Sequence, residues 1–147
     1  MKYEEIKTHF DEVIRNSDSY DTLKPCKDTS LLFPPFYEKI QELIKAYLEV
    51  HETEPYILET YRSNDLQELY YHRGASKIRK NGMHHYGIAV DLVAKVNGKI
   101  DYDTLDYAWL RNYATKELGL TVLTWELAHF QYIPVSEQQA LRNAVNA

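Results

Sequence analysis

The run from Gly87 to Val96, followed directly by Asn97-Gly98, constrains the fold of this chain more than any other feature of its sequence. The run is mostly apolar and β-branched, which favours a strand with buried faces. Asn-Gly between such runs is the strongest short-range hairpin signal. We therefore expect a strand over 87–96 that turns back through Lys99 and Ile100.

Helices and short strands are expected on both sides of this hairpin. Apolar spacing and capping residues predict helices at 2–15, from Pro35 through Leu48, from Ser63 or Asn64 to about His72, at 102–118 and after Pro134. Further strands are expected at 55–61, 121–124 and 129–133. Residues 16–35 are expected to form an ordered loop, because Leu31-Leu32-Phe33 needs burial. This alternation predicts the α+β class, with a small, mostly antiparallel sheet flanked by helices.

The chain length of 147 residues fits one domain and leaves no room for two independent cores. We expect a single domain, 1–147, with a helical N-terminal part at 1–50, a core at 55–134 and a C-terminal helix at 135–147.

Composition and charge exclude several classes of protein. A net charge of −5 without a run of Lys or Arg argues against nucleic acid as a partner. No apolar stretch approaches the ~18 residues of a membrane span, and the polar start is unlike a secretory signal. The single cysteine, Cys26, fits a reducing compartment, so a cytoplasmic location is expected. Thirteen tyrosines suggest a cleft with amphipathic walls.

Three side chains supply the donor set of a catalytic zinc site. Such a site takes three ligands from His, Asp and Glu and leaves a fourth position for water, and His84, Asp91 and His129 meet that count. Asp91 lies in an apolar strand, where an unpaired carboxylate would be costly and a metal ion would remove the cost. Read singly, an Asp in a strand can instead face water, and a lone His is more often structural.

Glu126 precedes His129 by three residues. A turn at Leu127-Ala128 would bring its carboxylate beside a water molecule at the metal, where it could accept a proton. The alternative is a surface Glu at a strand edge. His85 is not expected to be a ligand, because neighbouring side chains of a strand point to opposite faces. His9, His51 and His72 are expected to be solvated.

Three ordered segments resemble the signature of a known family. They are Tyr61-Arg62-Ser63 with Gln67 and Leu69-Tyr70, then His84-x-x-Gly87-x-Ala89-x-Asp91, then Glu126-x-x-His129. In this order they are similar to the pattern of the DD-peptidase/hedgehog-fold zinc peptidases. That family contains D-alanyl-D-alanine carboxypeptidases and dipeptidases, and phage L-alanyl-D-glutamate endopeptidases. The resemblance covers about residues 56–133.

The resemblance implies one zinc ion, Zn²⁺, per chain on His84, Asp91 and His129, with Glu126 as the general base. It also implies that Arg62 stabilises the oxyanion or holds a substrate carboxylate, a role that suits a guanidinium. Without the resemblance, Arg62 would be read as a surface arginine. Peptidoglycan stem peptides or muropeptides are the implied partners, and 55–134 would be the catalytic core.

The sequence departs from the family pattern at two positions. Gly82 stands where the family usually has Ser, and Ala128 stands where Pro often precedes the last ligand. His129-Phe130-Gln131 is similar to the phage endopeptidases, whereas Glu126 is more typical of the carboxypeptidases and dipeptidases. The cleaved bond therefore stays open between L-Ala-D-Glu and D-Ala-D-Ala.

Two functions of different classes fit these residues. One is a zinc peptidase, either cytoplasmic or endolysin-like and released to the cell wall through a phage pore. The other is a non-catalytic zinc-containing binding module of the same fold. Glu126 favours the enzyme, because a binding module needs no general base. The sequence does not determine the oligomeric state.

Overall fold

The computed structural model describes residues 3–76 and 78–147. Its helices are α1 (Glu4–His9), α2 (Pro34–Val50), α3 (Asn64–His72), α4 (Tyr107–Lys116) and α5 (Gln138–Val145). A π-helical turn, Phe10–Ile14, continues α1, and 3₁₀ turns lie at Thr29–Leu31, Met83–Tyr86 and Val135–Glu137. The strands are β1 (Tyr56–Ile57), β2 (Ala89–Val96), β3 (Lys99–Asp101), β4 (Thr121–Leu123) and β5 (Glu126–Gln131). No helix of these described residues is long and apolar enough to cross a membrane.

The sheet is built around β2, which pairs with β1, β3 and β5, while β4 pairs with the outer side of β5. All of these pairings are antiparallel. Asn97 and Gly98 have φ angles of +54° and +77°, as a tight hairpin turn between β2 and β3 requires. The predicted hairpin and the predicted α+β class with an antiparallel sheet are therefore confirmed.

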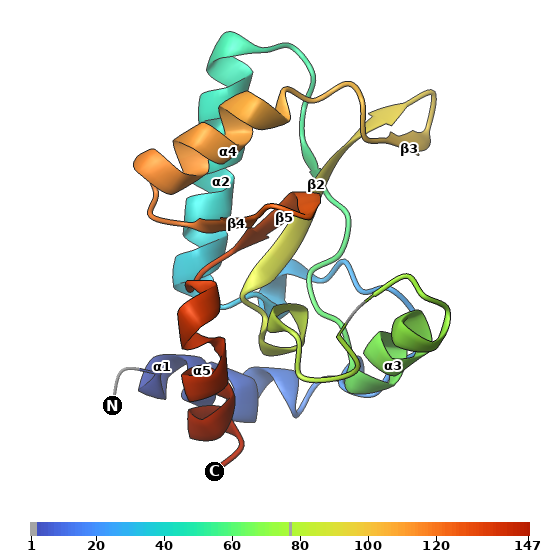
Figure 1. The fold of residues 1–147 in the computed structure, drawn as a ribbon, viewed down its shortest axis with the longest axis vertical. Helices are drawn as coiled ribbons and strands as arrows, with labels where there is room; N and C mark the ends of the chain where they lie inside the picture. The colour runs from blue at the N-terminus through green and yellow to red at the C-terminus, as the bar shows by residue number, and fades with distance from the viewer. Residues whose placement is uncertain (1–2, 77) are drawn as a thin grey trace.

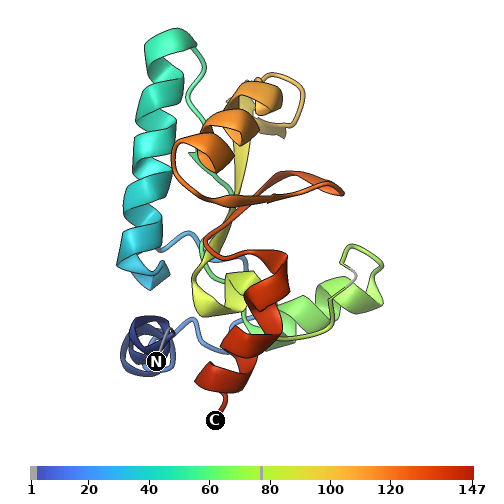
Figure 2. The same ribbon diagram turned by 60° about the vertical axis from the view of Figure 1, so that its left-hand side comes forward.

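Helices α2 and α4 lie beside the sheet, whereas α1 and α5 lie below it, as Figures 1 and 2 show. Helix α2 runs along one side of the sheet and contacts α4, which also packs on β4 and β5. Helices α1 and α5 contact one another near the two termini, and α3 lies apart from α2 in both views. Phe36, Ile40 and Leu43 on α2 are fully buried, and each such side chain contributes about 1.5–3 kcal/mol of transfer free energy.

The strand expected at 55–61 is observed only as β1, Tyr56–Ile57, because the chain stops pairing with β2 after these two residues. Leu58 still donates its N–H to the Asp91 carbonyl, but the next contacts are with the 16–35 loop. Thr60 donates to the Cys26 carbonyl, and Tyr61 forms an isolated bridge with Cys26. The loop therefore takes the backbone partners that a longer strand would have offered to the sheet.

The helix expected at 102–118 begins later, at Tyr107. One carboxylate oxygen of Asp101 accepts hydrogen bonds from the N–H groups of Asp103 and Thr104, which fixes a turn before the helix. Asp106 then caps α4 by accepting from the Trp109 N–H. These side-chain contacts compete with helical hydrogen bonds, as Asp often does.

The 16–35 loop is ordered as expected, with Leu31, Leu32 and Phe33 all buried. The expectation that His9 is solvated is wrong. Its side chain is buried, and its Nε2 lies 2.9 Å from the Leu31 carbonyl oxygen. His9 therefore ties α1 to the loop.

Gly87 is the position where this loop approaches the sheet most tightly. Its φ is +71°, and a Cβ there would lie 2.4 Å from the Leu31 carbonyl oxygen. Gly87→Ala should therefore cost about 2–5 kcal/mol in the free energy of unfolding, combining left-handed strain with overpacking. Gly74→Ala is the matched control, because Gly74 has φ +75° and open space around it.

Urea unfolding of the two variants measures the difference. The control should lose about 1–2 kcal/mol, the strain alone. If both variants lost the same free energy of unfolding, the close approach to the Leu31 carbonyl would contribute nothing to the cost of Gly87→Ala.

Candidate metal centre

The structure brings His84, Asp91 and His129 together, with one ligand atom from each within 4.8 Å of the others. Asp91 on β2 lies directly opposite His129 on β5, so both side chains share one face of the sheet. The Asp91 Oδ1 lies 3.7 Å from the His84 Nε2 and 3.5 Å from the His129 Nδ1. Backbone pairing therefore places two of the three candidate ligands.

The third candidate ligand, His84, lies in the 3₁₀ turn Met83–Tyr86. Gly87 ends this turn in the left-handed region, and the chain then enters β2. His85 points elsewhere, because its Nδ1 lies 3.2 Å from the Arg62 carbonyl oxygen. His85 is outside the three-residue group, as expected, but the reason is the turn rather than the alternation of a strand.

The hydrogen bonds of Gln131 fix the tautomer of His129. The Gln131 Nε2 donates to the Ile133 carbonyl and to Gln138, so its Oε1 faces His129 and accepts the Nε2–H at 2.8 Å. The Nδ1 of neutral His129 therefore carries a lone pair. A neighbour that orients a histidine through its other ring nitrogen is typical of metal sites.

In the described part of the chain, the groups nearest to that lone pair are carboxylate oxygens, which are acceptors. The His129 Nδ1 lies 3.5 Å from a carboxylate oxygen of Asp91 and 3.4 Å from one of Glu126. It is buried, and among the described residues it has no hydrogen-bond partner; the same holds for the His84 Nδ1. Converging acceptors without a donor fit a cation, and two imidazoles with one carboxylate fit zinc.

The pKa values of the three groups show the same need for positive charge. Burial lowers the pKa of His84 to about 3, so this imidazole is neutral. Burial opposes ionisation of Asp91, but the fields of His84, His129 and Arg62 hold its pKa well below the usual range. Burial also opposes the charge on His129, yet the negative charge of nearby Asp91 raises its pKa above the ordinary value for histidine. In the metal-free protein, a proton on His129 therefore supplies the positive charge that a bound metal cation would supply.

Glu126 reaches the cluster by a different route from the one predicted. No turn occurs at Leu127-Ala128; both residues lie in β5. Val122 pairs with Phe130 but Leu123 pairs with Glu126, so the register shifts and β5 bulges between them. Residues three apart in a regular strand face opposite ways, and this irregularity lets Glu126 reach His129. The Glu126 side chain is 48% exposed and lines the cleft.

Arg62 is not a surface arginine, because only 13% of its side chain is exposed. Its Nε and Nη2 each donate to a different carboxylate oxygen of Glu59 at 3.0 Å. Its Nη1 donates to the Gln67 Oε1 at 3.2 Å, and its guanidinium lies 4.8 Å from the Tyr70 ring centroid. These contacts hold the guanidinium at the wall of the cleft that the candidate ligands also line.

Sequence reasoning missed Glu59 and the role of Gln131. Glu59 is buried against Arg62, three residues before it, which nothing in the sequence pattern indicates. Gln131 follows His129 by two residues on a strand, a spacing that places both on one face and could have been used. Where Gly82 replaces the family Ser, a Cβ would lie 3.4 Å from the Gln67 Oε1, so Gln67 occupies that neighbourhood.

The cleft has a volume of about 410 Å³ and is lined by Arg62, His84, Asp91, Glu126 and His129 together with two tyrosines, Tyr70 and Tyr102. The tyrosines give it the amphipathic walls expected from the composition. The fold and the site together define an α+β domain with a candidate metal centre in an open cleft.

Solved structures with this fold exist, although the sequence matches no family model and no curated protein. The L-Ala D-Glu endopeptidase ChiX of Serratia marcescens matches with a TM-score of 0.59 at 19% identity, over 87% of this chain and 98% of that chain. The LD-carboxypeptidase LdcB matches with a TM-score of 0.57 at 17% identity, over 90% of this chain and 72% of that chain. The L,D-carboxypeptidase DacB of Streptococcus pneumoniae matches with a TM-score of 0.53 at 18% identity, over 87% of this chain and 76% of that chain.

At these identities the likeness shows a shared fold. The chain has the fold of these peptidases, which is the fold that the resemblance to DD-peptidase/hedgehog-fold proteins predicted.

The electrostatics of the metal-free site can be tested by NMR titration of its imidazoles. In the metal-free protein, His129 should titrate above 6.5 and His84 should stay neutral down to about pH 3. The folded state then holds the His129 proton more tightly than the unfolded chain. This group therefore stabilises the fold below pH 6.5, and the contribution is lost as the pH rises through its folded pKa.

Asp91→Asn is the informative variant. It removes the charge that raises the pKa of His129 while burial remains, so that pKa should fall below its value in the parent. A parent His129 that titrates at or below 6.5 would contradict the proposed pairing.

Proposed function

We propose that this protein is a zinc metallopeptidase that hydrolyses amide bonds of peptidoglycan stem peptides, with residues 55–134 as its catalytic core. One observation supports the proposal above all: the three candidate ligands, the half-exposed carboxylate of Glu126 and the mostly buried guanidinium of Arg62 line one cleft. His84, Asp91 and His129 would hold one zinc ion per chain. Bound there, zinc would polarise a substrate carbonyl and lower the pKa of water.

Glu126 is the general base in this proposal. Its carboxylate lies beside the ligand cluster but remains half exposed, so both water and substrate can reach it. It accepts a proton from the attacking water and returns it to the leaving amine, a role that typically contributes 10²–10⁴-fold to rate. The other function that fits the cluster, a zinc-containing binding module, has no use for this carboxylate.

Arg62 stabilises negative charge on the substrate. Glu59 and Gln67 fix the guanidinium before substrate arrives, so it needs no reorganisation when charge develops on the carbonyl oxygen. Its pKa is raised: burial lowers it, but the hydrogen bond and charge of Glu59 outweigh burial. Arg62 therefore stays charged in the cleft.

The substrate class rests on the fold. ChiX is named an L-Ala D-Glu endopeptidase, and LdcB and DacB are named LD-carboxypeptidases, with the LdcB structure described in terms of peptidoglycan recognition. Stem peptides or muropeptides are accordingly the proposed substrates. Digestion of purified peptidoglycan and of a D-Ala-D-Ala dipeptide, each followed by mass spectrometry, distinguishes an endopeptidase from a carboxypeptidase.

The assignment of base and ligand can be tested with a pair of variants. Glu126→Gln keeps the size of the side chain but cannot accept a proton, so hydrolysis of a stem peptide should fall by ~10²–10⁴-fold while zinc stays bound. His129→Ala removes a ligand, so it should lose zinc as well as activity. Elemental analysis and hydrolysis assays on both variants give the result.

Thermal melting provides the control, since Glu126→Gln should melt near the parent temperature. Parent-like hydrolysis by Glu126→Gln would show that another group is the base. Stoichiometric zinc with no hydrolysis of any stem peptide, in parent and variant alike, would favour the binding module.

Arg62→Lys tests the proposed oxyanion role. Lysine keeps the charge but cannot reproduce the two-donor contact with Glu59, so the charge is no longer held in place. Turnover should fall by ~10²-fold or more, the scale of losing one oxyanion donor, while zinc content stays unchanged. Turnover within a few-fold of the parent would assign Arg62 a purely structural role.

A further inference from the structure

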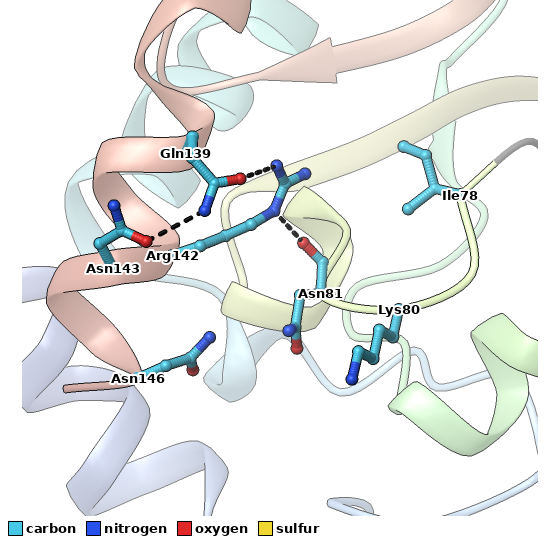
Figure 3. A pocket seen from close by; sticks show the side chains of 7 residues that line it. All are labelled: Ile78, Lys80, Asn81, Gln139, Arg142, Asn143 and Asn146. Carbon is cyan, nitrogen blue, oxygen red and sulfur yellow. Dashed lines mark hydrogen bonds between the residues drawn. The ribbon is translucent and has the colours of Figure 1, made fainter.

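A second cavity, of about 580 Å³, lies between α5 and the segment 78–81. Figure 3 shows the side chains of both elements that line it. Apart from Ile78, its walls are cationic or amide side chains: Lys80, Asn81, Gln139, Arg142, Asn143 and Asn146.

The charge of this cavity is opposite to that of the chain. The chain has 22 acidic residues and a net charge of −5, yet the described residues that line the cavity include two cations and no carboxylate. Among the described residues, neither Lys80 nor Arg142 forms an ion pair with a carboxylate. Two uncompensated cations in one hollow favour an anionic ligand.

Arg142 is held in place without being neutralised. Its Nε donates to the Asn81 carbonyl at 2.9 Å, and its Nη1 lies 3.4 Å from the Gln139 Oε1 (Figure 3). Both acceptors are uncharged, so the positive charge remains available. The side-chain amide of Gln139 also donates to Asn143 at 3.0 Å, which orders the α5 wall. An anchored guanidinium beside ordered amides suits a carboxylate attached to a peptide.

The cavity adjoins the candidate metal centre. Ile78 lines it and also lines a narrow cleft whose other walls include Arg62, His84 and Glu126. A substrate that extends from the metal centre past Ile78 would therefore reach Lys80 and Arg142.

We propose that this cavity is a remote subsite that binds a free carboxylate of the peptide substrate, with Lys80 and Arg142 as its charged contacts. The proposal rests on the proposed function and deepens it by naming a feature of the substrate. A glutamate linked through one of its carboxyl groups keeps the other free, so a stem peptide containing glutamate carries the required anion.

Lys80→Glu tests the subsite, because Lys80 is exposed and among the described residues anchors no other group. Lys116→Glu is the matched control: it makes the same charge change on an exposed residue of α4, which does not line this cavity. The substrates are a glutamate-containing stem peptide and the same peptide with its free carboxylate amidated. Steady-state kinetics with both peptides are measured for the zinc-loaded parent and both variants.

For the acidic peptide, Lys80→Glu should raise KM by about 5–20-fold with little change in kcat, the pattern of lost ground-state binding. The amidated peptide should be hydrolysed alike by parent and variant, and Lys116→Glu should match the parent throughout. An equal effect of Lys80→Glu on both peptides, or no effect on either, would overturn the subsite while leaving the proposed function intact.

A binding measurement separates the subsite from the chemistry. NMR titration of the protein with the acidic peptide should shift the resonances of Asn81, Arg142 and Asn143, and the amidated peptide should shift them much less. These shifts in a protein that hydrolyses neither peptide would support the subsite and refute the proposed peptidase. Hydrolysis of the acidic peptide without these shifts would support the proposed peptidase and refute the subsite.

Discussion

The pairing of Asp91 with His129 across β2 and β5 is the interaction on which the rest of the site depends. It places an ionised carboxylate in the wall of an apolar sheet, where an uncompensated charge would be costly. Burial opposes ionisation of this carboxylate, but the fields of His84, His129 and Arg62 keep it ionised. A proton on His129 supplies positive charge between the two imidazoles, and a divalent cation would supply it with two histidines and one aspartate as ligands.

Two hydrogen-bonded supports keep this arrangement in place. On the β5 side, Gln138 and the Ile133 carbonyl orient Gln131, and Gln131 in turn fixes the tautomer of His129. On the other side, Glu59 and Gln67 hold the guanidinium of Arg62. The groups proposed to act on substrate are thus held in position by hydrogen-bonded neighbours before substrate arrives, which is how preorganised sites limit reorganisation during a reaction.

The sequence allowed the fold class, the hairpin and the candidate ligands to be predicted, because each depends on short-range signals. Asn97-Gly98 determines its own turn, and the apolar run around Asp91 singles out its carboxylate as a candidate ligand. The sequence placed Gly87 in the strand, whereas it ends a 3₁₀ turn in the left-handed region and the strand begins at Ala89. His129 entered through the count of possible zinc ligands, and only the resemblance gave Arg62 a role, because no local signal marks that residue.

What could not be predicted depends on contacts between distant segments. The β5 bulge that brings Glu126 to the site is a shift in register against β4, and strand alternation alone gives the opposite face. The shortened strand β1 reflects competition from the loop around Cys26, and the burial of His9 reflects the same loop packing on α1. The cation-lined cavity is likewise invisible in sequence, since Lys80 and Arg142 are 62 positions apart (142 − 80) and meet only in the fold.

The most direct test of the account is the position of a bound metal ion. Crystals grown with zinc should show one strong anomalous peak at the zinc absorption edge, within about 2.0–2.3 Å of the His84 Nε2, the Asp91 carboxylate and the His129 Nδ1. The same crystals should show no comparable peak at His51 or His85. A peak at another site, or none between these three residues at full zinc saturation, would contradict the central claim that the Asp91–His129 pair exists to hold a cation.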